Sequence, residues 1–234
     1  MVNVLQQTIT ETAVHNVLEV GPGAGAITKY ILQIPGIDFK AVELDEEKIS
    51  YLEHIYPSIQ NRLIHKSFLE INDAVFETPF IVIGNFPYNI STQIVFKVLE
   101  WKDLVPVMIG MFQKEVAQRI ASKPGSKVYG IMSVLTQAFY EVEYLFDAAP
   151  GSFSPPPKVM SGVIKLKRKN EDLIIKSKNA FFLLVKTAFN QRRKTLRNAV
   201  RSLFTDDVLK ADIFNKRAEQ LSIDDFAALT FSMK

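Results

Sequence analysis

The segment "FIVIGNFPYN", residues 80–89, begins as a core strand and ends in groups that a core strand does not need. Its first four residues are β-branched or aromatic, which predicts a strand that is buried on both faces, as in a parallel sheet. The run stops at Asn85, and Phe86, Pro87 and Tyr88 follow. Proline cannot continue a central strand, so the sheet ends here. An amide, a proline and an aromatic ring at this point indicate a role other than packing.

Short apolar runs alternate with helical patterns around this segment. Alternation of this kind predicts an α/β fold, a Rossmann-like, doubly wound and mostly parallel sheet. Asp45 and Ser91 are the expected caps of two of the helices. We expect strands at 17–20, 39–44, 62–66, 79–85 and 105–112, and helices at 26–33, 45–56, 91–101 and 113–121.

Two more strands are expected in the second half of the chain, at 131–146 and 159–169. Between them lies "SFSPPPK", residues 152–158, whose three prolines predict a stiff extended loop.

The character of the sequence changes after Arg168, where helical periodicity replaces strand patterns. It breaks near Asn190 and returns in a last helix capped by Ser222. We therefore expect two domains, a Rossmann-like domain at 1–168 and a small all-helical domain at 169–234.

The composition excludes several kinds of site. The absence of cysteine rules out disulfides and thiolate metal sites. The three histidines, His15, His54 and His65, match no metal-ligand spacing, so no metal is expected. No apolar run reaches the roughly 18 residues of a membrane span, and the N-terminus does not resemble a signal peptide. We expect a cytoplasmic protein without a membrane partner, and a monomer.

Charge is distributed unevenly along the chain. Residues 1–157 contain 11 Lys and Arg against 17 Asp and Glu, whereas residues 158–234 contain 17 against 8. A basic C-terminal third predicts a polyanionic partner, although a solvated lysine-rich surface would give the same count.

A glycine-rich turn, "GPGAG" at 21–25, follows the first strand and precedes a helix. Gly21, Gly23 and Ala26 fit the loosened dinucleotide fingerprint, G-x-G-x-x-G/A. With Glu19 the glycines also fit E-x-G-x-G-x-G, which is typical of S-adenosyl-L-methionine-dependent methyltransferases. Glu43, at the end of the next strand, can accept hydrogen bonds from a ribose in either class. The turn alone leaves open a methyltransferase, a dinucleotide-binding protein and a ligand-free turn.

The segment from Asn85 to Tyr88 favours the methyltransferase. Ligands of open α/β sheets bind beyond the carboxyl ends of the strands, so this segment faces the same crevice as the glycine turn. The Asn85 side-chain oxygen and the Pro87 carbonyl can accept both N–H bonds of an adenine amine, which aims its lone pair at a sulfonium methyl. Tyr88 can stack on the base. Positioning and electrostatics then supply the rate.

These motifs together resemble the KsgA/Erm family of rRNA adenine N6,N6-dimethyltransferases. "NFPYNIS" (85–91) is similar to the N-[LF]-P-Y-N-[IV]-S block of that family. The blocks "FQKEVAQRI" (112–120), "FSPPPKV" (153–159) and "FNQRRKTLRN" (189–198) follow in family order, and the last resembles the small-subunit branch. The resemblance runs from about Val17 to Leu229.

The resemblance implies roles for individual residues. Gly21 and Gly23 approach the methionine part of S-adenosyl-L-methionine, with Glu19 supporting the turn, and Glu43 holds the ribose. Asn85 serves cofactor and target base together, and Pro87 supplies a backbone acceptor. Aromatic rings from two places, Tyr88 and Phe153, close on the two faces of the adenine, which must be unstacked to enter.

Two features depart from the family pattern. Ser67, followed by Phe68, stands where the family carries an aspartate that contacts the adenine of the cofactor. A neutral hydrogen bond in place of a charged one weakens cofactor binding by about 1–2 kcal/mol. Only 16 residues precede Val17, and none matches the Gln-x-Phe-Leu block of the family, so we expect the N-terminal lid to be short or missing.

Basic residues near the C-terminus predict an RNA-binding track. A helix from about residue 191 would place Arg193, Arg197 and Arg201 on one face. Such a face suits phosphates, which dominate nucleic-acid affinity. The predicted RNA contacts are Arg192, Arg193, Lys194, Arg197 and Arg201, extended by Lys114 and Arg119.

The sequence therefore predicts an enzyme that forms N6,N6-dimethyladenosine at two adjacent positions near the 3′ end of small-subunit rRNA, on a pre-ribosomal small subunit. A ribosome-assembly factor with impaired catalysis is one alternative. An adenine methyltransferase that acts on large-subunit rRNA or DNA is another.

Overall fold

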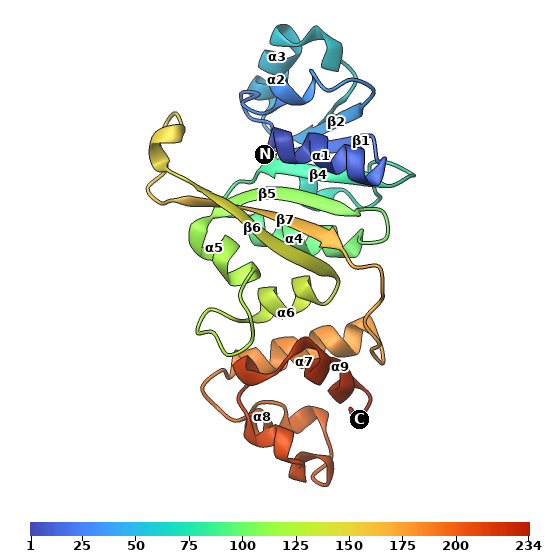
Figure 1. Cartoon of the computed structure of the whole chain (residues 1–234), viewed down its shortest axis with the longest axis vertical. Helices are drawn as coiled ribbons and strands as arrows, with labels where there is room; N and C mark the ends of the chain where they lie inside the picture. Colours follow the sequence, from blue (N-terminus) through green and yellow to red (C-terminus); the bar gives the residue numbers. More distant parts are fainter. The chain divides into compact units, whose positions relative to one another are not determined.

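The computed structural model describes all 234 residues (Figure 1). Its strands are β1 (Asn16–Val20), β2 (Asp38–Glu43), β3 (Leu63–His65), β4 (Phe80–Asn85), β5 (Val107–Gln113), β6 (Tyr140–Ala148) and β7 (Ser161–Arg168). Its α-helices are α1 (Val2–Thr12), α2 (Thr28–Ile31), α3 (Glu46–Ile55), α4 (Ser91–Glu100), α5 (Lys114–Ile120), α6 (Ile131–Gln137), α7 (Lys178–Asn190), α8 (Leu196–Ala199) and α9 (Ile223–Thr230). No helix has both the length and the apolar character that crossing a membrane requires.

The chain forms two compact units. The first contains Met1–Ala117 and Glu143–Arg168, and the second contains Gln118–Val142 and Lys169–Lys234. The point predicted as a domain boundary, after Arg168, is one of three where the chain passes between the units. The segment Gln118–Val142 joins the C-terminal helices in the second unit, and the sequence patterns did not indicate this.

The seven strands form one sheet in the order β3-β2-β1-β4-β5-β7-β6. The pairs β3–β2, β2–β1, β1–β4 and β4–β5 are parallel, and β7 runs antiparallel to β5. The predicted doubly wound, mostly parallel sheet is therefore confirmed. The strand order reverses between β1 and β4, which is where such sheets bind ligands beyond the carboxyl ends of the strands.

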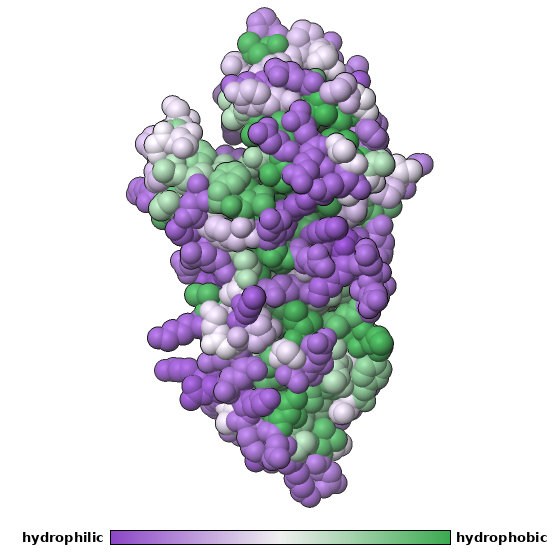
Figure 2. Space-filling model, in the orientation of Figure 1, coloured by the Kyte–Doolittle hydropathy of each residue, from purple (hydrophilic) through white to green (hydrophobic).

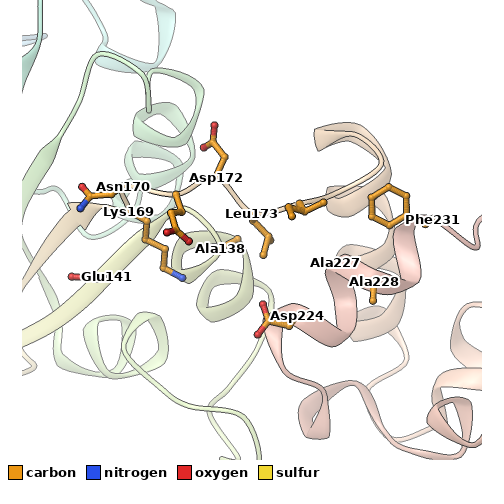
Figure 3. A pocket seen from close by; sticks show the side chains of 12 residues that line it. Ala138, Glu141, Lys169, Asn170, Asp172, Leu173, Asp224, Ala227, Ala228 and Phe231 are labelled. Atoms are coloured by element: carbon orange, nitrogen blue, oxygen red, sulfur yellow. The ribbon is translucent and has the colours of Figure 1, made fainter.

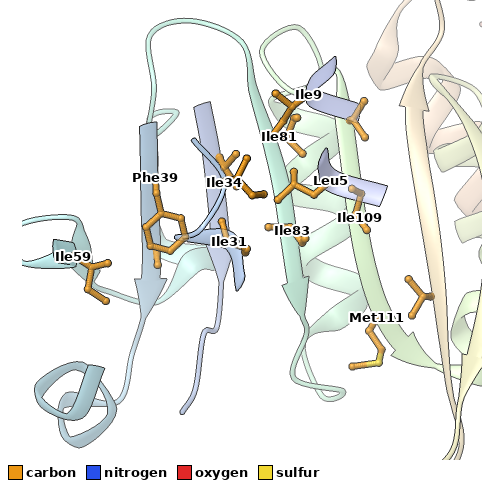
Figure 4. Close-up of a cluster of buried hydrophobic side chains, with 14 of the residues drawn as sticks. Leu5, Ile9, Ile31, Ile34, Phe39, Ile59, Ile81, Ile83, Ile109 and Met111 are labelled. Atoms are coloured by element: carbon orange, nitrogen blue, oxygen red, sulfur yellow. The ribbon is translucent and has the colours of Figure 1, made fainter. Parts of the chain in front are cut away.

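The centre of the sheet is buried on both faces because β4 and β5 carry apolar residues at successive positions. Ile81 and Ile83 of β4 belong to a cluster with residues of α1, α2 and α3, such as Leu5 and Ile31 (Figure 4). Phe80, one residue out of phase with them, packs instead near Trp101 at the end of α4. Continuous apolar strands covered by helices on both faces are characteristic of parallel sheets.

The prediction of one strand at 131–146 was wrong. Residues Ile131–Gln137 form α6, and the strand begins only at Tyr140. The Ser133 hydroxyl accepts a hydrogen bond from the Gly130 N–H at the start of the helix. Apolar side chains at Ile131, Val134 and Leu135 have the i, i+3, i+4 spacing of a helix, and this period was missed in the longer apolar run.

The predicted helix from residue 191 that would align Arg193, Arg197 and Arg201 was also wrong. Helix α7 ends at Asn190, and residues 191–194 form a turn closed by a hydrogen bond from the Lys194 N–H to the Gln191 carbonyl. Thr195 is extended, with φ −63° and ψ 152°, and α8 has four residues. The three arginines therefore lie on a turn, a short helix and a 3₁₀ helix, and do not form a helical stripe.

Candidate active site

The glycine turn and the segment after β4 meet at the point where the strand order reverses. Strands β1 and β4 are paired, with Glu19 opposite Ile83. A Cβ atom added to Gly21 would lie 3.6 Å from Cδ of Pro87, which is van der Waals contact. The two motifs that the sequence singled out are therefore neighbours in space.

Positive φ angles explain why the turn needs glycine. Gly21 has φ 69° and Gly23 has φ 58°, a region that side chains of L-residues disfavour. No atom lies within 4 Å of the position where a Cβ of Gly23 would be. The backbone at Gly23 consequently faces open space, which a ligand can approach closely.

The Glu43 carboxylate is held in place by the backbone of two loops. Its Oε2 accepts a hydrogen bond from the Gly23 N–H at 3.1 Å. Its Oε1 accepts from the N–H groups of Leu44 and Asp45 at 2.9 and 3.1 Å. A carboxylate has about four acceptor positions, so one on Oε2 remains for a ligand hydroxyl.

Glu19 lies beneath the glycine turn and is buried, with 1% of its surface exposed. Thr28 donates a hydrogen bond to its Oε2 at 2.8 Å, and its Oε1 has no hydrogen-bond partner. Burial raises the pKa of Glu19 to about 8, the charge of Glu43 adds to this rise, and the hydrogen bond from Thr28 opposes it. At neutral pH the side chain is therefore mainly protonated, and it supports the turn as a neutral group.

Glu19→Gln is expected to flatten the pH dependence of folding stability. The folded chain keeps a proton that the unfolded chain loses near the ordinary pKa of 4.5, so the stabilisation is complete below pH 4.5 and is lost as the pH rises through about 8. Each pH unit between these values removes up to about 1.4 kcal/mol. Urea unfolding at pH 5.5 and 8, without cofactor, should show this loss in the wild type and not in Glu19→Gln.

The exposed Glu77 provides the control, because Glu77→Gln removes a carboxylate without changing the buried site. Equal losses of unfolding free energy in the wild type and Glu19→Gln would contradict the buried protonated carboxyl.

The two candidates after β3 have different surroundings. Ser67 is half-buried. The N–H of its neighbour Lys66 donates a hydrogen bond to the Glu43 carbonyl, which brings Ser67 close to Glu43. Phe68 is buried, and its ring packs edge-on against Trp101, with ring centroids 5.4 Å apart. The Phe68 ring is therefore part of the core and does not form an open face for a ligand.

Exposed and buried residues alternate at the end of β4. Asn85 and Pro87 are exposed, and Phe86 between them is 1% exposed. The Pro87 carbonyl, predicted to accept from a substrate amine, already accepts from the Ile90 N–H at 3.1 Å, which leaves one lone pair.

The prediction that Ser91 caps α4 was wrong, because Ser91 is the first helical residue and its hydroxyl donates to the Tyr88 carbonyl.

Phe86 anchors this segment in a notch between two glycines. Gly84 of β4 and Gly110 of β5 are directly paired. A Cβ on Gly84 would lie 2.6 Å from the Phe86 ring, and one on Gly110 would overlap that ring and lie 2.6 Å from Phe112. Both positions must therefore lack a side chain for the ring to fit, and the seated ring fixes Asn85 and Pro87 on either side.

Tyr88 is linked to the start of β7. Its hydroxyl lies 2.6 Å from the hydroxyl of the fully buried Ser161. Phe153 lies in the connection between β6 and β7, is half-buried and packs against the apolar cluster of Figure 4. Ser161 thus joins Tyr88 to the end of the β6–β7 loop, which carries Phe153, the other residue predicted to contact the base.

The other end of this loop is held by ionic contacts. Lys114 Nζ lies 2.5 Å from Asp147 Oδ2, and the Tyr144 hydroxyl donates to Asp147 Oδ1. The hydrogen bonds from Lys114 and Tyr144 hold the pKa of Asp147 below its usual range. Lys114, predicted to bind RNA, is therefore engaged in an ion pair within the first unit.

The basic residues of the second unit also differ in their contacts. Arg192 pairs with Glu219 at 2.8 Å and donates to the Lys127 carbonyl, and Arg197 donates to the Leu209 carbonyl. Arg201 lies 3.9 Å from Asp206, and Arg119 is exposed near the end of α5. The exposed side chains of Arg193 and Lys194 make no ion pair, and they line a hollow of about 500 Å³ at the turn after α7.

Sequence reasoning missed several residues that shape the site. Thr28 and Ser161 contact predicted residues, but a hydroxyl gives no sequence signal until its partner is known. The glycine pair Gly84 and Gly110 could have been found, because a glycine inside a buried strand marks a close approach of other atoms.

Comparison with known proteins settles the family. The sequence model of the family described as ribosomal RNA adenine dimethylase matches residues 3–233. The chain belongs to the ribosomal RNA adenine dimethylase family. This confirms the resemblance seen in the sequence, and members of this family are methyltransferases that use S-adenosyl-L-methionine.

Curated relatives agree with the assignment. The chain is 50% identical over 229 residues to Ribosomal RNA small subunit methyltransferase A of Flavobacterium johnsoniae, covering 97% of this chain and 87% of the relative. It is also 50% identical to the protein of that name from Cytophaga hutchinsonii, covering 92% and 84%. Among solved structures, a dimethyladenosine transferase from Plasmodium falciparum shares the fold, with TM-score 0.79, 24% identity and coverage of 96% and 92%.

Proposed function

We propose that this protein dimethylates N6 of two adjacent adenosines near the 3′ end of small-subunit rRNA, on a pre-ribosomal small subunit. Family membership and the two relatives that are 50% identical and are named for the small subunit support this substrate. The structural observation that carries the proposal is the close approach of Gly21 and Pro87, because it brings the glycine turn beside the Asn85 segment.

The residues on the first side of this contact fit S-adenosyl-L-methionine, which when bound supplies an electrophilic methyl group. The open backbone at Gly23 lets the methionine part approach, and the positioned Glu43 carboxylate has an acceptor left for a ribose hydroxyl. Protonated Glu19 supports the turn from below. Ser67, beside Glu43, offers a neutral hydroxyl to the adenine of the cofactor.

The residues on the second side of the contact fit an extruded adenine. Asn85 is exposed at the strand end and can accept one N–H of the exocyclic amine, and the free lone pair of the Pro87 carbonyl can accept another. The nitrogen lone pair then points away from both acceptors, toward the methyl donor. The cofactor would supply the methyl group and depart as a neutral thioether, and the displaced amine proton would pass to solvent. After one methylation an N–H remains, which allows a second round.

The RNA-docking part of the proposal rests on fewer residues than the sequence indicated. Arg193 and Lys194 are exposed and make no ion pair, so we assign them the phosphate contacts of the second unit. Arg192 and Arg197 hold neighbouring loops through their hydrogen bonds, so we assign them a structural role beside the phosphate-binding residues.

Transfer of radiolabelled methyl from S-adenosyl-L-methionine tests the proposal. The substrates are undermethylated small ribosomal subunits, naked small-subunit rRNA, large-subunit rRNA and duplex DNA. Label is expected as dimethyladenosine in the small subunits. Label only in large-subunit rRNA or DNA would contradict the proposed substrate, and small-subunit binding without label would indicate an assembly factor.

Loss of the Tyr88–Ser161 hydrogen bond is expected to lower kcat. One such bond contributes about 1 kcal/mol, so Ser161→Ala and Tyr88→Phe should each reduce kcat about fivefold. Because the two changes remove the same bond, the double variant should be no slower than either single variant. Steady-state methyl transfer by the four proteins measures this, with unfolding free energy and cofactor affinity as checks. Multiplicative losses would show that the two hydroxyls act separately.

A further inference from the structure

One feature that the proposed active site does not explain is a pocket of about 810 Å³ in the second unit (Figure 3). It lies between the linker that follows β7 and helix α9, with the end of α6 and the start of β6 beside them. Its volume is in the range of pockets that take several side chains or a small ligand. No residue in it is among those that we assign to catalysis or RNA docking.

The apolar part of this pocket is open to solvent. Ile174 of the linker is 81% exposed, and Phe231, just after α9, is 55% exposed. Leu173 lines the same pocket (Figure 3). Figure 2 shows apolar surface over the region where Figure 1 draws the linker and α9. Large apolar side chains that share an exposed pocket in this way indicate an interaction surface.

The charge around the pocket is opposite to that of the unit that carries it. The second unit has 16 Lys and Arg against 9 Asp and Glu. Four of these nine acids line the pocket, and Lys169 is its one basic residue. Elsewhere in the unit, acids such as Asp207 and Glu219 form ion pairs, whereas Glu141, Glu171 and Asp224 make none.

This combination selects one kind of partner. Phosphate groups would be repelled by the acidic rim, so the pocket does not extend the RNA-binding surface. A cation on a flexible stem can pair with the rim while a neighbouring apolar side chain enters the pocket. The complementary ligand is therefore a polypeptide segment that alternates lysine or arginine with large apolar residues.

We propose that this pocket docks a basic, apolar segment of a small-subunit ribosomal protein. The choice of source rests on the proposed function, because proteins of that chemistry stand beside the rRNA on a ribosomal particle. Contact with such a segment would let the enzyme recognise an assembled particle through its protein as well as its RNA.

A peptide-binding experiment tests the pocket without RNA or cofactor. The probe is a fluorescein-labelled 12-residue peptide in which lysine and arginine alternate with leucine and phenylalanine, followed by fluorescence anisotropy at 150 mM salt. Glu141→Lys/Glu171→Lys and, separately, Ile174→Ser are expected to weaken binding at least tenfold. The matched controls are Asp73→Lys/Glu77→Lys and Leu183→Ser, which make two acid-to-lysine changes and one aliphatic-to-serine change at exposed positions outside the pocket. These controls should leave binding unchanged.

Two further peptides separate pocket binding from general attraction. Replacement of leucine and phenylalanine by serine, or of the basic residues by glutamate, should each abolish binding. Equal affinity for the serine peptide, or equal weakening by the control variants, would overturn the proposal.

Cosedimentation and methyl transfer with small subunits connect the pocket to the particle. The pocket variants should cosediment less with small subunits than the control variants do. Methyl transfer without peptide binding would reject the docking site and leave the proposed function intact. Peptide binding without methyl transfer to any RNA would reject the proposed function and leave the pocket as a site for basic peptides. Unchanged cosedimentation of the pocket variants would reject a ribosomal protein as the source of the segment.

Discussion

Asn85→Ala is expected to lower kcat for methyl transfer by about a hundredfold to a thousandfold, the loss seen when one preorganised hydrogen-bonding group of an active site is removed. In the proposed mechanism, the Asn85 side-chain oxygen holds one amine N–H and so directs the nitrogen lone pair. Alanine leaves that N–H without an acceptor. Because Asn85 is exposed, the free energy of unfolding should change by less than about 0.5 kcal/mol. Single-turnover methyl transfer to small subunits, at saturating cofactor, measures the effect.

Two other variants make this test specific. Asn85→Asp keeps an acceptor oxygen at the same place and should retain more activity than Asn85→Ala. Asn89→Ala removes another exposed amide only four residues away, which has no assigned role, and should remain within a few fold of the wild type. Wild-type rates in Asn85→Ala would remove Asn85 from the mechanism and leave the Pro87 carbonyl as the candidate acceptor.

Gly110→Ala is expected to impair folding stability and activity together. The added methyl group would overlap the Phe86 ring and lie 2.6 Å from Phe112, so the ring must leave its notch. Overpacking of this kind costs about 1–3 kcal/mol of folding free energy. Displacement of Phe86 also moves Asn85 and Pro87, and a shift of about 1 Å in a reacting group can cost a hundredfold in rate. Urea unfolding and methyl transfer on the same preparation measure both effects.

Gly151→Ala is the matched control, since no atom lies within 4 Å of its added Cβ and its backbone does not require glycine. A second variant tests the assigned cause. Phe86→Leu in the Gly110→Ala background removes the ring atoms that the new methyl group meets, and leucine is the other residue that the family block carries here. It should recover part of the lost stability. If stability does not recover, the clash that destabilises Gly110→Ala is with Phe112 and not with Phe86.

The sequence predicted those parts of the site whose signals are local. Asn85 ends a strand whose first four residues are all large and apolar, so both the strand and its end were readable. The parallel sheet then placed Asn85 to Tyr88 beside the glycine turn. The side chain of Asp45 accepts hydrogen bonds from the N–H groups of Glu47 and Lys48, so this predicted helix cap is confirmed. Such contacts depend on neighbours within a few residues.

Contacts between distant residues could not be read in this way. Ser161 meets Tyr88 across 73 residues of sequence, and neither residue type indicates the other. The basic run after Asn190 misled for a different reason. Its spacing fits a helix, but the extended backbone at Thr195 interrupts it, and the contacts of Arg192 and Arg197 with the rest of their unit decide their orientation.

The three backbone hydrogen bonds to Glu43 have a thermodynamic consequence for cofactor binding. A free glutamate side chain loses rotational freedom worth up to about 1.5–2 kcal/mol when it is fixed. Here that loss occurs when the protein folds, before any ligand arrives. If Glu43 binds the ribose as proposed, the ribose hydroxyl meets an acceptor that is already oriented, and the entropy of this side chain does not oppose binding. The same bonds tie the Glu43 loop to the glycine turn, so occupancy of the ribose site should slow the opening of both loops, which amide hydrogen exchange at Gly23 and Leu44 would report.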